Sequence, residues 1–150
     1  MKNIFTETDK NEILQRVEKL TAQSQPLWGA MTVSQMLAHF AEASRIPLGE
    51  VTIKRVSFSF NVLGVLIKSV VLGPKPFLHN TATPAETRIT SDKDFESEKA
   101  KYINAVNQLY EGGEKIIKAG KHHFLGKLSP AEWGRMIYKH ADHHLSQFGV

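Results

Sequence analysis

The stretch SPAEWGRMIYKHADHHLSQF, residues 129–148, decides the fold, because it has the pattern of one long amphipathic helix. It starts as a capping box, with Ser129 as the N-cap, Pro130 in the first helical position and Glu132 in the third. On a 3.6-residue period one stripe gathers Trp133, Met136, Ile137, His140, His144, Gln147 and Phe148. Two histidines therefore lie one turn apart in the middle of the face that we expect to be buried.

The pair His140 and His144 is the strongest chemical signal in the chain. Side chains at i and i+4 have Cβ atoms about 5–6 Å apart, and both imidazoles then reach one ion at metal–nitrogen distances of about 2.0–2.1 Å. The alternative is a pair of histidines at the edge of the core, bonded to backbone or water. Ala141 stands where a zinc protease needs its glutamate, which argues against a metalloprotease. We therefore expect a metal site of another kind.

A third ligand has to come from another part of the chain, and His39 is the first choice. It borders the apolar stripe of a helix that we expect over residues 32–46, with a capping-box start. The alternative for His39 is a core histidine that is bonded to its surroundings. His79 and His122 are rivals, but both lie in expected loops.

Other polar residues near the pair have two interpretations each. His143 lies on the flank of the stripe, either facing a substrate or partly exposed at the surface. Asp142 faces the other way, either solvated or in a salt bridge. We expect His122 and His123 to be a solvated loop pair rather than a pair of ligands to one metal, because adjacent residues of an extended chain point in opposite directions.

The rest of the chain predicts three further helices, over residues 9–23, over 58–72 and from Asp92 or Asp94 to about residue 111. Asp9 and Glu12 are the expected capping residues of the first of these. The apolar segment 58–72 is typical of a central bundle helix, with Gly64 at a close helix crossing; a homodimer interface is the other option. Residues 51–53 have β character without deciding between strand and loop.

Between these helices lies a long irregular connection, residues 73–91, that we expect to lie across the mouth of a site. A loop is expected over residues 120–127. The count of four main helices plus one apolar helix predicts an all-α bundle that forms a single domain, 1–150.

Composition excludes several classes of protein. The 150 residues include no cysteine, so disulfides, thiolate catalysis and cysteine-ligated metals are excluded. The net charge of +4 is scattered, and we expect no nucleic-acid partner. Neither a signal peptide nor a membrane-spanning segment is visible, so we expect a cytoplasmic protein without membrane contact.

Three segments of the sequence, 28–39, 124–134 and 139–149, resemble the DUF1569 family of uncharacterised bacterial proteins, which is grouped with the DinB/YfiT-like superfamily of metalloenzymes. The resemblance implies a four-helix bundle in up-down-down-up order, with a long crossover between the second and third bundle helices. It also implies one divalent metal ion on His39, His140 and His144. The family segment His-Pro-Phe-Phe-Gly is His-His-Phe-Leu-Gly here, at residues 122–126.

The same resemblance implies a metal-dependent enzyme, either a transferase or a hydrolase. Some relatives transfer low-molecular-weight thiols such as bacillithiol to small electrophiles, and His143 or His122 would act as the base. We expect zinc or nickel first, with iron or manganese also compatible. The alternative is a non-catalytic protein of stress or detoxification in which the metal staples two helices; a nucleic-acid binder is the third and least favoured option.

Overall fold

The computed structural model describes the backbone of residues 1–54 and 58–150 and the side chains outside 55–61. Nearly all regular structure in these ranges is helical, so the fold is all-α. The elements in chain order are α1 (Glu7–Glu18), α2 (Val33–Ala43), α3 (Phe58–Val71), η1 (Ala85–Thr87), α4 (Phe95–Gly112), η2 (Gly113–Ile116), β1 (Lys121–His122), β2 (Gly126–Lys127) and α5 (Pro130–Gln147).

Local capping signals define where the helices begin. The capping boxes predicted at 32–35 and 129–132 are both present, and Asp94 caps α4. The first helix is present, but its predicted bounds were wrong. α1 begins two residues earlier, because the Thr6 hydroxyl, and not Asp9, accepts from a first-turn N–H, and it ends at Glu18. Asp9 instead lies inside the first turn, where the positive end of the helix dipole stabilises its carboxylate.

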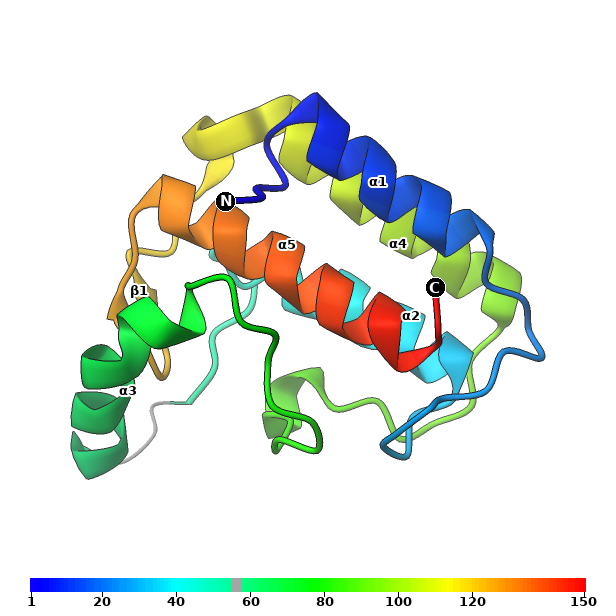
Figure 1. The fold of residues 1–150 in the computed structure, drawn as a ribbon, viewed down its shortest axis with the longest axis horizontal. Coiled ribbons are helices and arrows are strands. Elements are labelled where there is room, and N and C mark those ends of the chain that lie inside the picture. Colours follow the sequence, from blue (N-terminus) through cyan, green and yellow to red (C-terminus); the bar gives the residue numbers. More distant parts are fainter. Residues whose placement is uncertain (55–57) are drawn as a thin grey trace.

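Four of the helices, α1, α2, α4 and α5, pack around the main hydrophobic core (Figure 1). Its buried side chains include Ile13, Val17, Met36, Leu37, Phe40, Tyr102, Val106, Leu109, Ile137, Ala141 and Leu145. Burial of this apolar surface is the main favourable term in folding, at about 25 cal/mol per Å². Because α2 and α5 share this core, their facing sides come close together.

Arg16 of α1 contacts one side of α5. The Arg16 guanidinium donates to the Asp142 carboxylate at 2.6 Å and to the Ser146 hydroxyl at 3.0 Å. Asp142 therefore faces α1, as one of its two predicted roles required. The opposite side of α5, which carries His140 and His144, is then directed toward α2.

The apolar helix α3 lies outside this core, and its predicted position as a central bundle helix was wrong. Figure 1 shows it beside the hairpin at one end of the molecule, away from α1 and α4. It contributes no residue to the main core, and its outer side chains are 43–73% exposed at Val62, Leu63, Leu66 and Val70. Gly64 approaches the hairpin rather than a helix: a Cβ there would lie 2.1 Å from the Phe124 carbonyl oxygen.

The predicted loop 120–127 is a tight hairpin, in which Lys121 pairs with Lys127 and His122 with Gly126. The long connection is irregular except for η1, as predicted. Residues 51–54 form no strand, and residues 55–57 lie outside the described part of the chain. Among the described helices, none combines the length and apolar character that crossing a bilayer requires.

Candidate metal centre

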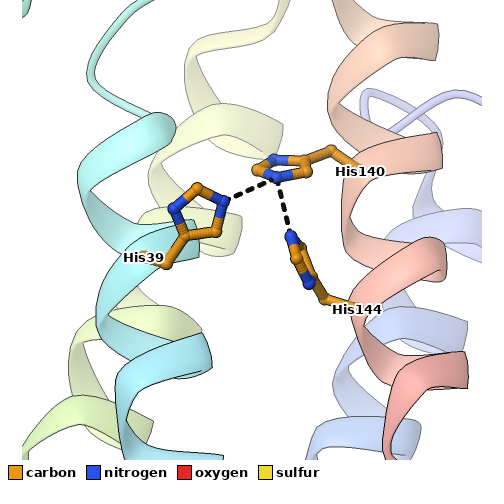
Figure 2. Close-up of side chains that lie close together, drawn as sticks. All are labelled: His39, His140 and His144. Atoms are coloured by element: carbon orange, nitrogen blue, oxygen red, sulfur yellow. Dashed lines mark hydrogen bonds between the residues drawn. The ribbon is translucent and has the colours of Figure 1, made fainter. Parts of the chain in front are cut away.

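Three histidine side chains converge between α2 and α5 (Figure 2). The Nε2 atom of His140 lies 3.1 Å from Nε2 of His39 and 3.0 Å from Nε2 of His144. One ring nitrogen from each residue lies within 4.8 Å of the other two. The two helices therefore bring together the three residues that the sequence singled out.

Hydrogen bonds on the far side of two rings determine which nitrogen faces the centre. The Nδ1 atom of His39 lies 2.8 Å from the Thr87 carbonyl oxygen, which only accepts, so this Nδ1 carries the proton. The Nδ1 atom of His144 lies 2.9 Å from the Gln147 side-chain oxygen. The Gln147 amide nitrogen donates to the Trp28 carbonyl at 2.7 Å, which orients that amide. Both histidines therefore direct an Nε2 lone pair inward.

This arrangement fits a cation better than it fits hydrogen bonds alone. A neutral His140 carries at most one proton on Nε2, so it can donate fully to only one of the two converging lone pairs. The remaining contact is lone pair against lone pair. Tetrahedral ligands with bonds of 2.0–2.1 Å are separated by about 3.3 Å, close to the 3.0 and 3.1 Å found here. A divalent ion would accept all three lone pairs.

Burial keeps the three imidazoles in the form that metals bind. Desolvation lowers the pKa of His39, lowers that of His144 to about 3, and lowers that of His140 well below its ordinary value. A metal ligand has to be the neutral imidazole. The triad is therefore neutral at physiological pH before any ion arrives.

A cavity of about 1000 Å³ adjoins the three histidines. Its walls come from α2, α5, the segment 28–31, the hairpin and residues 77–90 of the long connection. The lining is mainly apolar and aromatic, with residues that include Trp28, Met31, Ile46, Phe77, Trp133, Met136 and Ile137. Any ion on the triad would have a space of small-molecule size beside it.

His143 lines this cavity and is half-buried. Its ring centroid lies 5.2 Å from that of His144 and 5.9 Å from those of Trp28 and Phe77. Burial, and next the nearby His79, lower its pKa. In the described part of the chain its ring nitrogens form no hydrogen bond, so they are available to a ligand.

His122 has a different environment from the one predicted. Its Nδ1 accepts the backbone N–H groups of Phe124 and Leu125, both at 3.2 Å, and burial lowers its pKa to about 3. The expectation of a solvated pair was wrong for both His122 and His123, because both are partly buried and line the cavity, and the hairpin folds His122 inward against Trp133. His79, the other rival, stacks on Trp28 at 3.8 Å and is not part of the triad.

Gln147 and Thr87, which orient two of the three histidines, were not predicted as site residues from the sequence. Gln147 had a usable signal, because it is a polar residue on the apolar stripe three positions after His144. Thr87 had none, since it contributes only a backbone oxygen from a distant loop.

Comparison with known proteins gives a family match over almost the whole chain. A family model described as “Protein of unknown function (DUF1569)” matches residues 2–149. No curated protein and no solved structure matches this chain.

Proposed function

We propose that this chain, which belongs to the DUF1569 family, binds one divalent metal ion through His39, His140 and His144 and acts as an enzyme on a small molecule in the adjoining cavity. One observation carries the proposal. Two of the three Nε2 lone pairs are oriented inward by Thr87 and Gln147, beside a space large enough for a substrate. Partners of this kind on the outer nitrogen are what metal-binding histidines need.

The metal proposed first is zinc or nickel, with iron and manganese as the other candidates. Three neutral nitrogen ligands without a carboxylate suit metals that prefer imidazole over oxygen. Three protein ligands also leave a coordination position open, as in catalytic rather than structural zinc sites. When bound, such an ion lowers the pKa of a coordinated thiol or water and makes it nucleophilic near neutral pH.

The reaction that we propose is transfer of a low-molecular-weight thiol to a small electrophile. The chain contains no cysteine, so the sulfur nucleophile would come with the substrate. His143 is the better base, because its nitrogens are available in the cavity, whereas His122 already accepts two hydrogen bonds through Nδ1. His143 would take the thiol proton while the carbon–sulfur bond forms and the leaving group departs with its electron pair. The apolar walls would exclude competing water.

We also propose that the helices have the DinB/YfiT-like arrangement. Support comes from the four helices α1, α2, α4 and α5 around one core and from the long crossover between α2 and α4. The triad residues also stand on the second and the last of these helices.

A non-catalytic role is the second candidate, and one observation favours it. His39 belongs to α2, whereas His140 and His144 belong to α5, so a bound ion would link two helices that are far apart in sequence. Binding of an ion to the folded state alone raises stability by mass action. In this case the metal would stabilise the fold and the cavity would have no turnover.

Two measurements test the proposal. The purified protein is loaded with zinc or nickel, and metal content is compared with that of the variant His140→Ala/His144→Ala; His79→Ala is the control, because His79 lies outside the triad. We expect roughly one ion per chain in the wild type and the control, and loss of the ion in the double variant. Equal metal in all three proteins contradicts the site.

Turnover is then measured with cysteine, coenzyme A or bacillithiol and a chromogenic aryl halide. Loss of thiol transfer on chelation, restored by the metal, supports the enzyme. A large fall in melting temperature on chelation, without turnover on any of these pairs, favours the structural role.

A further inference from the structure

The described walls of the cavity carry one positive side chain and no negative one. Among the described residues that line it, none is aspartate or glutamate, and Arg88 is the single lysine or arginine. A histidine that binds a metal does so as the neutral imidazole, so the triad itself contributes no negative charge. A divalent ion on the triad would therefore keep its full charge of +2, with no carboxylate of the cavity wall to balance it.

Such a charge in an apolar cavity requires a counter-charge. Partial burial of an uncompensated ion is costly, because the low-dielectric surroundings replace water poorly. Because no carboxylate is among the described residues that line the cavity, this counter-charge has to come from the ligand. A ligand that carries negative charge is therefore favoured over a neutral molecule of the same shape.

Arg88 supplies a second positive position at the edge of the same cavity. Its Nη2 donates to the Thr83 carbonyl at 3.0 Å, and its other guanidinium N–H groups have no partner in the described part of the chain. Arg88 directly follows Thr87, whose carbonyl holds His39. The guanidinium is therefore anchored to the same loop that orients a triad residue, and two or more of its N–H groups are left for an anion.

The remaining walls describe the body of the ligand. Trp28 and Phe77 place aromatic rings near His143, at centroid distances of 5.9 Å each. Rings of this kind pack against flat or apolar groups. The cavity of about 1000 Å³ is of the size that takes a small organic molecule rather than a bare ion.

From these observations we infer that the ligand of this cavity is a small organic anion: an apolar or aromatic body with a thiolate end directed to the triad and a carboxylate that pairs with Arg88. This inference rests on the proposed function, both its metal site and its thiol reaction, and adds to them the class of substrate. It also assigns Arg88 as a residue that determines specificity.

The test uses two thiols that differ only at the far end, 4-(mercaptomethyl)benzoate and its primary amide. Both are titrated calorimetrically into zinc-loaded full-length protein and into two variants. Arg88→Gln removes the positive charge of the arginine at the edge of the cavity and leaves the zinc ligands in place. Arg45→Gln is the matched control, because Arg45 is an exposed arginine that pairs with Glu42 and Glu50 and does not line the cavity.

We expect the wild type and Arg45→Gln to bind the carboxylate about tenfold more tightly than the amide, the amount typical of one partly exposed charge-assisted contact. Arg88→Gln should bind both thiols with the affinity of the amide. Equal affinity of the two thiols for the wild type, a preference that survives in Arg88→Gln, or binding of neither thiol would each overturn the inference. The zinc content of the same samples reports separately on the proposed metal site, so the two failures are distinguishable.

Discussion

The Nδ1 atom of His39 lies 2.8 Å from the carbonyl oxygen of Thr87, a residue 48 positions further along the chain. This one bond connects the buried triad to the long connection that forms a wall of the cavity. It fixes the tautomer of His39 and holds η1 against α2 at the same time. The position of the loop and the orientation of the His39 ring are therefore coupled, which makes the partners of the triad as testable as the triad itself.

Gln147→Leu should weaken metal binding without removing a ligand. The variant loses the acceptor for His144 Nδ1 and the bond to the Trp28 carbonyl, so the ring is free to rotate and to change tautomer. We expect zinc affinity to fall roughly 10–100-fold, measured by competition with a chromogenic chelator. Gln25→Leu, at an exposed position, is the control. Wild-type affinity in Gln147→Leu would show that this partner is dispensable.

The metal-free protein should lose stability as the pH falls from 6.5 to 5. Burial lowers the pKa values of His122 and His144 to about 3 in the folded state, whereas an unfolded histidine has a pKa of about 6.5. The unfolded state therefore binds more protons in this window, so the free energy of unfolding decreases with acidification, by up to about 1.4 kcal/mol per pH unit for each such histidine.

Urea denaturation in the presence of a chelator measures this slope. His144→Gln should reduce the dependence of the unfolding free energy on pH by the contribution of one histidine. A denaturation midpoint that stays constant between pH 6.5 and 5 would contradict the buried, neutral state of these histidines.

Lys139→Met should release the start of the long connection. The Lys139 ammonium donates to the carbonyl oxygens of Val71, the last residue of α3, and of Gly73 and Lys75, which follow it, and lies 4.8 Å from the Phe77 ring centroid. Its loss leaves partly buried acceptors unpaired, at a cost of about 1–3 kcal/mol in the free energy of unfolding. Amide exchange over residues 71–77 should accelerate, and Lys93→Met, at an exposed lysine, should change neither quantity. Unchanged exchange would rule out this anchoring role.

The two buried tyrosines should respond oppositely to loss of the hydroxyl. The Tyr102 hydroxyl is buried and has no hydrogen-bond partner in the described part of the chain, so Tyr102→Phe should leave stability unchanged or raise it by up to about 1 kcal/mol. The Tyr138 hydroxyl donates to Glu12 at 2.9 Å, and Tyr138→Phe should cost about 1 kcal/mol. Urea unfolding of both variants checks the signs; destabilisation by Tyr102→Phe would mean that its hydroxyl has a partner, such as ordered water.

Local signals predicted much of the fold. The capping boxes at 32–35 and 129–132 and the cap at Asp94 depend only on residues three positions apart, and all three are present. The start of α1 was misplaced by two residues because Thr6 and Asp9 are both good capping residues. The helical character of α3 was predictable as well, but its place was not, since an apolar composition does not tell a central helix from one at the edge.

The sequence by itself determined that His140 and His144 share one inward face, because helical periodicity is a local property and the two residues are four positions apart. It also determined that any metal site would use no cysteine. Only the tertiary structure decided which distant groups meet that face. His39 joins the pair because α2 and α5 share a core. Thr87 orients His39, and the Trp28 carbonyl orients Gln147, through contacts that packing creates. Non-local contacts of this kind depend on the closure of loops around a core and leave no periodic trace in the chain.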